Sequence, residues 1–537
     1  MPAQAKDVFP NTEAICQNCR NHVIIFNNLV FGNNGHQIQK KMEAGFKLKL
    51  NGQYRAAVGT ARWHRVLLLL LGLDAACNAW ASSDVAGQAT PFTSPNDATE
   101  RCVVLDHMPG GHYKDTDLAK EAELCAIDFY DGDHALCPKV FSTSPGTLIY
   151  EINGGADSTD PEVFERQACG GGINKNAARG EPISYKMSVN TRESSATFAN
   201  SSLIYYHFAR YFHAGVDVPV AVFRSIDRKE HARRVSTRGV SLSAGHPGLK
   251  MNHAAWQALH AAEMDPSSYR PTSELFTPDG LLYGVMLHPS GKRYSEEING
   301  TRESGWGNGQ NLDFQETAPF RALRSEELLA AAIEEGKRVA LQNPRLAKAT
   351  GNDATPQQMT YWMSDLIDIT LLDFIFSQQD RIGNIDYMAY WRWSEGGVLR
   401  SRRADSRVVP ADLAALEPIY IKQTELGDND AGVRLTYVNY TKRTNMLEKL
   451  RHYRAETYLQ LMRLDQDFQS SGPLHEYVRT TFGLSESEFK QVVANTREAA
   501  GILRASCKAG RLHFDVEPEQ FLLTAEVAPK PVQCELP

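Results

Sequence analysis

Residues 377–387 read SQQDRIGNIDY and place Asp380, Arg381, Asn384 and Asp386 on one short polar loop. A carboxylate such as Asp380 can orient or deprotonate a hydroxyl group, and the amide oxygen of Asn384 suits Mg²⁺. We take Asp380 and Arg381 as the catalytic candidates, with Arg381 fixing the loop through a carboxylate or a carbonyl group. The alternative interpretation is an ordinary solvated turn.

A second acidic stretch, GDNDAG, follows a predicted strand and contains Asp428 and Asp430. Carboxylates at this spacing are suited to bind Mg²⁺ between phosphate oxygens. The stretch also has the D-x-D-x-G start of a calcium-binding EF-hand loop. It lacks the acidic residue at the twelfth position and the flanking pair of helices, so we exclude that interpretation. An ordinary acidic turn remains the alternative.

A lysine on a predicted strand offers the third element of a phosphate site. Gly170, Gly171 and Gly172 form a glycine-rich turn, and the strand that follows, over residues 183–189, contains Lys186. The glycines permit close approach of the backbone to a ligand, and the ammonium group can reach phosphate oxygens. A solvated strand lysine is the simpler explanation when this feature is taken alone. Together, however, the three stretches hold what phosphoryl transfer requires: a cation, metal ligands and a carboxylate near the acceptor hydroxyl.

The surrounding elements are predicted from apolar periodicity. A helical pattern over residues 198–212 is followed by a strand over 216–226. A second helix over 355–379 has Thr355 as its cap and Pro356 at its first position, and it delivers the chain to Asp380. Strands at 385–393 and 419–426, and helices at 325–342, 444–468 and 485–506, complete the pattern. Residues 228–320 are mixed and predict an insertion with short elements.

This order of motifs resembles the atypical protein-kinase-like superfamily, which includes secretory-pathway, spore-coat, phosphoinositide and HipA-type kinases. The order is glycine-rich turn, strand lysine, helix, strand, helix, D-R-x-x-N loop, strand and D-x-D-x-G, and it covers roughly residues 165–465. The resemblance implies an α+β, two-lobed fold. Its small N-terminal lobe is rich in β-strands, and its larger C-terminal lobe is mostly helical, with insertions.

The resemblance also implies roles for single residues. Lys186 matches the lysine that holds ATP phosphates, Asp380 matches the catalytic aspartate, and Asn384 resembles the metal ligand of the catalytic loop. Asp430, followed by Ala-Gly, matches the second metal-binding aspartate, with Asp428 as its rival. The implied cofactors are ATP and Mg²⁺, with Mn²⁺ as the alternative. The implied activity is that of an ATP-dependent phosphotransferase acting on a hydroxyl group of a protein, a glycan or a small molecule.

The sequence departs from the family pattern in two places. Asn384 follows Asp380 by four positions where the family uses five, so either the loop is shorter or Asp386 supplies the metal ligand. The helix after Lys186 has no evident glutamate to pair with the lysine, and Glu193 is the near candidate. A pseudokinase-like binding module without catalysis, nucleotidyl transfer on the same fold and an enzyme of unrelated fold therefore stay open as alternatives.

The first 81 residues resemble a leader for export. Arg62 and Arg65 precede the apolar run 66–73, and Ala79 and Ala81 form a small-x-small triplet, which is typical of a signal peptide cleaved after Ala81. The run is too short to span a bilayer, and the alternative is a buried core helix. Removing residues 1–81 leaves six of nine cysteines, which can form three disulfides in any of fifteen connectivities. We therefore predict a secreted, periplasmic or secretory-lumen protein.

Composition is that of a globular protein that does not depend on bulk charge. The 537 residues are 42% hydrophobic and 23% charged, with a net charge of −7, which disfavours a nucleic-acid partner. The mature chain shows no stretch that predicts a stable membrane span. We predict a leader over 1–81 with its signal peptide at 66–81, a disulfide-stapled extension over 82–164, an N-terminal lobe with an insertion over 165–320, and a helical C-terminal lobe over 321–537.

Overall fold

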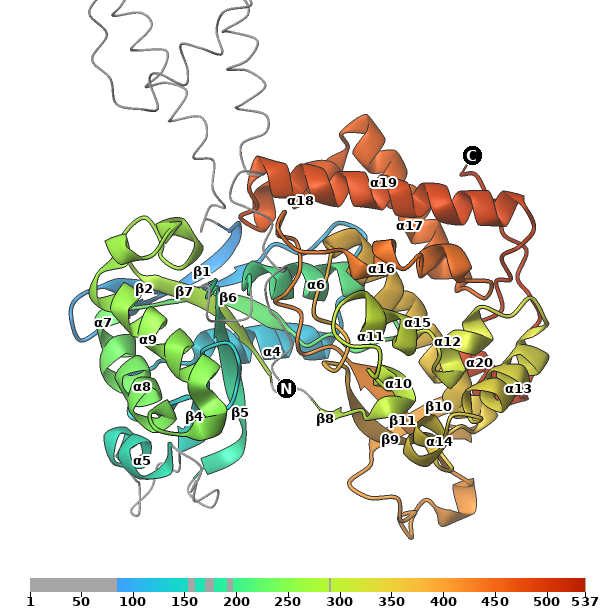
Figure 1. The fold of residues 1–537 in the computed structure, drawn as a ribbon, viewed down its shortest axis with the longest axis horizontal. Coiled ribbons are helices and arrows are strands. Elements are labelled where there is room, and N and C mark those ends of the chain that lie inside the picture. Colours follow the sequence, from blue (N-terminus) through green and yellow to red (C-terminus); the bar gives the residue numbers. More distant parts are fainter. Residues whose placement is uncertain (1–84, 153–159, 170–177, 191–196, 289–290, 537) are drawn as a thin grey trace, which may run out of the picture. The chain divides into compact units, whose positions relative to one another are not determined.

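The computed structural model describes residues 85–152, 160–169, 178–190, 197–288 and 291–536. The predicted signal peptide, the turn Gly170–Gly172 and Glu193 lie outside these residues. The described residues belong to one compact unit, Ala79–Pro537. Figure 1 shows a lobe built around strands β1–β7 on one side and a mostly helical lobe, α10 to α20, on the other. The predicted fold class, α+β with a β-rich N-terminal lobe and a larger, mostly helical C-terminal lobe, is confirmed.

The N-terminal lobe is built on an antiparallel sheet of seven strands in the order β1-β2-β6-β7-β5-β4-β3. The strands are β1 (Gly87–Thr93), β2 (Thr99–Leu105), β3 (His134–Pro138), β4 (Gly146–Ile152), β5 (Ala178–Met187), β6 (Ala221–Ile226) and β7 (Leu282–Leu287). Lys186 on β5 pairs with Gly146 of β4 and with Val285 of β7, so it lies inside the sheet. Strands β1–β4 come from residues 82–164, which were predicted as an extension. Their sequences, such as GQATPFT in β1 and TERCVVL in β2, lack the strict apolar–polar alternation that predicts a strand.

The helices of this lobe come both from the early part of the chain and from the inserted segment. They are α4 (Asp115–Ala126), α5 (Pro161–Ala168), α6 (Asn200–Tyr211), α7 (Arg228–His231), α8 (Thr237–Ser243) and α9 (Lys250–Met264), with a π-helical segment Ala232–Ser236 between α7 and α8. Almost every residue of α6 is buried, including Asn200, Ser201 and Ser202, so the helix is covered on more than its predicted apolar face. The inserted segment also contacts this sheet, because Nε2 of His231 in α7 lies 2.8 Å from Oγ1 of Thr147 in β4.

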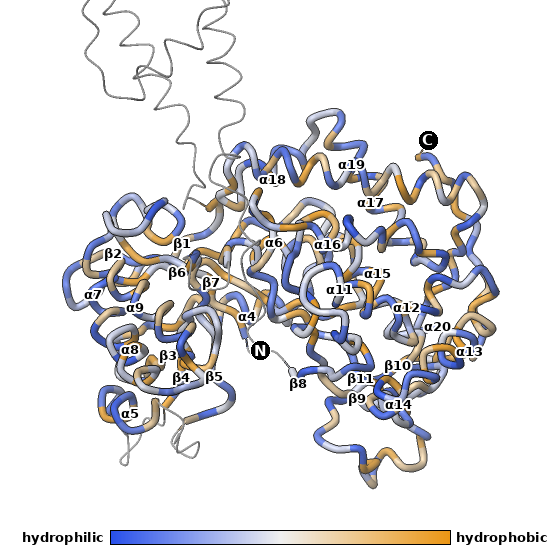
Figure 2. Tube along the Cα trace, viewed as in Figure 1, coloured by the Kyte–Doolittle hydropathy of each residue, from blue (hydrophilic) through white to orange (hydrophobic). Residues whose placement is uncertain are grey.

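The C-terminal lobe is organised around the long helix α15 (Pro356–Phe376). The Thr355 side chain accepts a hydrogen bond from the backbone N–H of Gln358, and Pro356 occupies the first turn, as predicted. Figure 2 shows hydrophobic colouring in α15, whose residues from Gln358 onward are buried. The helix ends at Ser377, whose φ of 53° turns the chain into the polar loop.

The other helices of this lobe are α10 (Glu296–Asn299), α11 (Asn308–Phe314), α12 (Ala318–Leu323), α13 (Leu329–Ala340), α14 (Pro344–Thr350), α16 (Tyr440–Arg443), α17 (Ala455–Ser470), α18 (Pro473–Thr481), α19 (Glu486–Lys508) and α20 (Pro518–Thr524). Of these, α12, α13, α16, α19 and α20 pack on α15. Helices α10 to α12 derive from the segment predicted as an insertion, and α12 packs on α13 and α15. The sequence predicted short elements here without assigning them, because helices of four to seven residues are too short to show a period.

A second sheet of four strands lies in the C-terminal lobe and carries the site loops. It consists of β8 (Lys292–Arg293), β9 (Asp386–Glu395), β10 (Val398–Arg403) and β11 (Ile419–Glu425), with β9 paired to each of the other three. Strands β9 and β11 were predicted. Strand β10 has mostly exposed residues and β8 has two residues, so neither has a recognisable pattern.

The six cysteines outside the predicted leader form three disulfides: Cys102–Cys125, Cys137–Cys169 and Cys507–Cys534. The expectation of three disulfides is thus confirmed, and the connectivity that the sequence left open is defined. In the part of the chain that the structure describes, no helix is both long enough and apolar enough to cross a membrane.

Candidate active site

A cavity of about 510 Å³ brings together predicted residues from three distant segments. Lys186 comes from β5, Asp380 and Asn384 come from the loop after α15, and Asp428 and Asp430 come from the loop after β11; all five line the cavity. Arg293 of β8 and the loop 139–145 between β3 and β4 line it as well.

Lys186 is paired with both aspartates of the second loop. Its Nζ lies 2.8 Å from Oδ1 of Asp428 and 3.4 Å from Oδ2 of Asp430, and it donates to the carbonyl oxygen of Gly427 at 3.1 Å. Burial lowers the pKa of this ammonium group, but the two carboxylates more than offset that effect, so its pKa is raised and the lysine remains charged.

The pKa values of the two aspartates are shifted in opposite directions. Burial raises the pKa of each, but Lys186 binds Asp428 more closely and lowers the pKa of Asp428 below its ordinary value. The pKa of Asp430 is raised, because burial and the negative charge of Asp428 outweigh the attraction of Lys186. Asp428 is therefore ionised throughout the neutral range, whereas the charge of Asp430 depends on which cations are present.

Two neighbouring carboxylates fit the way proteins bind Mg²⁺. This ion is held by one or two carboxylates, and water and substrate phosphates complete its octahedral shell. Among the described residues, no group of three or more His, Cys, Asp or Glu side chains is arranged to hold a metal ion. A metal at Asp428 and Asp430 would thus take its remaining ligands from phosphate and water, which suits a nucleotide site.

Asp380 has the environment of a general base. Its backbone N–H donates to Oε1 of Gln378 at 3.1 Å, and Nδ2 of Asn384 donates to its backbone oxygen at 2.8 Å. No hydrogen bond to its carboxylate occurs within the described part of the chain, so the carboxylate is available to a ligand. Burial, followed by the charges of Asp428 and Asp430, raises its pKa to about 7. A base with a pKa near the working pH is suited to proton transfer.

Arg381 lies behind the cavity and connects the two loops. Its guanidinium group is 4% exposed and forms an ion pair with Asp373 of α15, with Nε 2.9 Å from Oδ2. It also donates to the carbonyl oxygen of Asp428 at 3.1 Å and to Oδ1 of Asn429 at 2.9 Å. The Tyr205 hydroxyl donates to the same Asp373 carboxylate at 2.7 Å. Arg381, proposed from sequence as a catalytic residue, therefore contacts protein groups and positions the loops.

Replacing Arg381 by methionine is expected to destabilise the fold strongly. The Asp373 carboxylate would stay buried without its cation, a loss that costs about 3–5 kcal/mol for buried pairs. Denaturant unfolding measures the change. The matched control is Arg400→Met, which removes an ion pair to Glu395 whose partners are both more than half exposed; it is expected to change stability by less than about 1 kcal/mol. Equal losses of stability in the two variants would contradict a stabilising role for the buried Arg381–Asp373 ion pair.

Asn384 and Asp386 share a partner that the sequence did not reveal. Nη1 of Arg293 donates to Oδ1 of Asn384 at 2.6 Å, and Nε of Arg293 contacts Oδ1 of Asp386. Gly383 adopts a φ of 94°, and its N–H donates to Asn299 at 2.7 Å, which folds the loop tightly. The four-residue spacing thus places both predicted metal ligands against the same guanidinium group. Burial raises the pKa of Asp386, and Arg293 opposes this effect.

The loop between β3 and β4 was not predicted as part of the site. Residues 139–145 line the cavity and include the hydroxyl groups of Ser142, Thr143 and Ser144. Asn252 of the inserted helix α9 donates to the backbone oxygens of Val140 at 3.2 Å and Ser142 at 2.5 Å. The signal that could have identified the loop is its Ser-, Thr- and Pro-rich composition between two apolar segments, which is typical of a hairpin turn.

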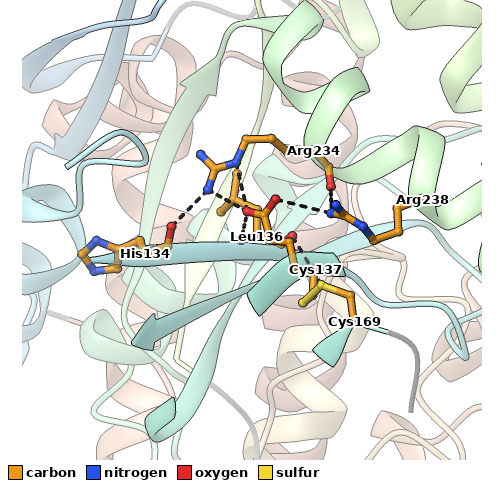
Figure 3. The surroundings of a disulfide bond; sticks show 7 residues. His134, Leu136, Cys137, Cys169, Arg234 and Arg238 are labelled. Carbon is orange, nitrogen blue, oxygen red and sulfur yellow. Dashed lines mark hydrogen bonds and ion pairs between the residues drawn. A yellow bond between two sulfur atoms is a disulfide. The ribbon is translucent and has the colours of Figure 1, made fainter. Parts of the chain in front are cut away.

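The Cys137–Cys169 disulfide anchors the base of this loop. Both cysteines line the cavity, and Figure 3 shows the surrounding polar contacts. The backbone N–H of Leu136 donates to Oε1 of Glu165 at 2.8 Å, and Arg234 binds the same carboxylate oxygen at 2.7 Å. Arg234 also donates to the backbone oxygen of His134 at 3.0 Å. The start of the loop is thereby fixed to α5 and to the inserted helices.

Removing this disulfide is expected to weaken nucleotide binding as well as stability. The variant Cys137→Ala with Cys169→Ala should lose about 2–5 kcal/mol of stability and bind nucleotide several-fold more weakly, because the cavity wall is no longer fixed. The control, Cys507→Ala with Cys534→Ala, removes a disulfide that joins α19 to the C-terminal segment. Calorimetry of both variants should show comparable losses of stability, with the nucleotide dissociation constant changed in the first alone. An unchanged constant in both would refute the role of the loop.

Comparison with known proteins gives little beyond a distant likeness of fold. No protein-family model matches the chain, and no curated protein matches it. Among solved structures, the crystal structure of the Golgi casein kinase with Mn/ADP bound is similar with a TM-score of 0.35 and 10% identity. The similarity covers 85% of this chain and 92% of that chain. What this protein does is therefore inferred from its own side chains.

Proposed function

We propose that this protein is a kinase-like phosphotransferase that moves a phosphoryl group from Mg-ATP to a hydroxyl acceptor. The observation that carries the proposal is the convergence of Lys186, Asp380, Asp428 and Asp430 on one cavity. Lys186 and Asp380 are 194 positions apart in the sequence, and Asp428 follows Asp380 by another 48. Residues this far apart in the sequence are not expected to converge by chance on one cavity. Together they supply the cation, the carboxylates and the base that this chemistry needs.

Each residue has a role in the transfer. The acceptor oxygen forms a bond to the γ-phosphorus, the bond from phosphorus to the β,γ-bridging oxygen breaks, and its electron pair leaves with ADP. The acceptor proton passes to the Asp380 carboxylate, whose pKa of about 7 suits a base. The Lys186 ammonium binds phosphate oxygens. A metal bound by Asp428 and Asp430 would neutralise phosphate charge.

We further propose that the protein works in an oxidising compartment of a secretory pathway, or after delivery into another cell. The six cysteines outside the leader all pair in disulfides, which persist in such environments. The predicted signal peptide agrees with this proposal. A kinase needs ATP, which favours a secretory lumen or a host cell over the open extracellular space.

The function can be tested with purified, disulfide-intact protein. A ligand that binds the native state raises the melting temperature, so Mg-ATP and Mn-ATP are expected to raise it in a concentration-dependent way. Label from γ-³²P-ATP should then move to a hydroxyl group in a panel of proteins, glycans and small alcohols, with release of ADP. Absence of any nucleotide effect on the melting temperature would overturn the proposal.

A second candidate, a nucleotide-binding module without catalysis, is favoured by one observation. Lys186 is held by the metal-site aspartates themselves, and no glutamate contacts it among the described residues. This module would show the thermal shift with nucleotide but no transfer to any acceptor. Nucleotidyl transfer is distinguished in the same assay, because it moves an α-phosphate label and releases pyrophosphate.

A further inference from the structure

Arg293 is a cavity-lining cation whose backbone is fixed on both sides. It lies on β8, where it pairs with Asp386 of β9. The next residue, Tyr294, is 2% exposed and donates its backbone N–H to the oxygen of Ile385 at 3.1 Å. The Tyr294 hydroxyl donates to the oxygen of Lys422 at 3.1 Å. The Arg293 side chain is therefore attached to a well-anchored part of the C-terminal lobe, directly beside the loop that carries Asp380.

The guanidinium group is bound on one edge and open on the other. Nε contacts Asp386, and Nη1 contacts Oδ1 of Asn384 and the backbone oxygen of Gly383. Nη2 has no hydrogen-bond partner in the described part of the chain. The side chain is 47% exposed and lines the same cavity as Lys186 and Asp380. A planar, permanently charged fork that lines the cavity thus keeps Nη2 free of protein hydrogen bonds within the described residues.

Two of the three partners of Arg293 are the side-chain oxygens of Asn384 and Asp386, which the sequence predicted as metal ligands. A metal ion on Asn384 and Asp386 would have to displace the guanidinium group, and that change would separate Arg293 from a carboxylate that is 5% exposed. The Asp386 carboxylate already has a compensating cation in Arg293, so a metal there would compete with a guanidinium group that the chain itself supplies. The same two oxygens instead orient a cation that binds phosphate bidentately, a geometry for which arginine is preferred over lysine.

We propose that Arg293 binds the terminal phosphate of the nucleotide, in the place that a second metal ion would take, and is oriented for this by Asn384 and Asp386. The inference rests on the proposed function and deepens it. Lys186 from the N-terminal lobe and Arg293 from the C-terminal lobe, which line the same cavity, then both hold the phosphates. The metal bound by Asp428 and Asp430 is the single one required. In the transition state, Arg293 donates hydrogen bonds to the oxygens of the transferred group and exchanges no proton.

Nucleotide binding by an Arg293→Met variant distinguishes this role from a structural one. With the disulfide-intact protein, isothermal titration with ATP and with ADP is performed in EDTA and again in Mg²⁺. We expect the affinity for ATP to fall about tenfold, as for a charge-assisted contact, while the affinity for ADP changes less than about twofold. The transfer rate is expected to fall about 10³-fold, and Arg293→Lys should restore only part of it. Lys292→Met, on the same strand, is the control for strand integrity.

Metal stoichiometry provides a readout that does not depend on activity. Mn²⁺ bound in the presence of ADP is counted by electron paramagnetic resonance. One ion is expected in the wild type and in Asp386→Asn, and none is expected in Asp430→Asn.

Two results would overturn the proposal: equal losses of ATP and ADP affinity in Arg293→Met, or two ions in the wild type with one lost in Asp386→Asn. A wild-type protein that binds neither nucleotide would instead overturn the proposed function itself.

Discussion

Asp380→Asn is expected to lower phosphoryl transfer about 10³-fold, the contribution of a well-placed general base, while leaving nucleotide binding intact. Asparagine keeps the shape of the side chain but cannot accept the acceptor proton. Nucleotide affinity should persist, because Lys186, Asp428 and Asp430 are unchanged. The rate of the wild type should rise with pH through the neutral range, because Asp380 must lose its proton first and its pKa is raised to about 7. That pH dependence should be absent from the residual activity of the variant.

The same substitution is expected to stabilise the protein at alkaline pH. The pKa of Asp380 is raised in the folded state, so folding becomes less favourable as pH rises from the unfolded pKa of 3.8 to the folded value of about 7. Below this window both states are protonated, and above it the full penalty applies. The melting temperature of Asp380→Asn should therefore exceed that of the wild type at pH 8 and match it near pH 4.

The control for this experiment is Asp279→Asn, at an exposed turn before β7. It is expected to alter neither transfer nor melting temperature. Retained transfer in Asp380→Asn would remove the base from the mechanism. A melting temperature lower than that of the wild type at pH 8 would show that Asp380 is a structural group whose loss damages the loop.

Helix α15 shows what could be predicted from the sequence. Thr355 and Pro356 define its start, its apolar residues define its path, and the polar loop at Asp380 follows directly. These are local signals, because capping and periodicity act within a few turns of chain. Strands β9 and β11 were recognised for the same reason. The candidate residues on the adjoining loops could be named because loops after buried elements are where functional side chains lie.

Long-range pairings carried no such local signal. Arg293 belongs to a strand of two residues, and only the pairing of that strand with β9 brings it to Asn384 and Asp386. The loop 139–145, which lines the cavity, belongs to a sheet that also pairs segments more than a hundred residues apart, such as β2 and β6. A sequence pattern shows which face of a helix or strand is buried, but not which other element pairs with it. The predicted glycine turn and Glu193 lie outside the described residues and stay predictions.

Asp428 and Asp430 are both candidates for the metal ligand on which Mg²⁺-dependent nucleotide binding would depend. Asp428 lies closer to Lys186, and its side chain is 38% exposed, against 13% for Asp430. The raised pKa of Asp430 means that its negative charge is the one that a bound cation would stabilise most. We therefore expect Asp430 to be the principal metal ligand and Asp428 the principal partner of Lys186.

Asp430→Asn is accordingly expected to remove the part of nucleotide binding that depends on Mg²⁺. At a nucleotide concentration 100 times the dissociation constant, binding stabilises the wild type by about 2.7 kcal/mol, and the Mg²⁺-dependent share of this should vanish in the variant. Asp428→Asn should keep the Mg²⁺ dependence but weaken binding in EDTA as well, because Lys186 loses its orienting partner. Melting temperatures with ATP across an Mg²⁺ titration separate the two. The reverse pattern would make Asp428 the metal ligand, whereas insensitivity of both variants would remove the metal from this loop altogether.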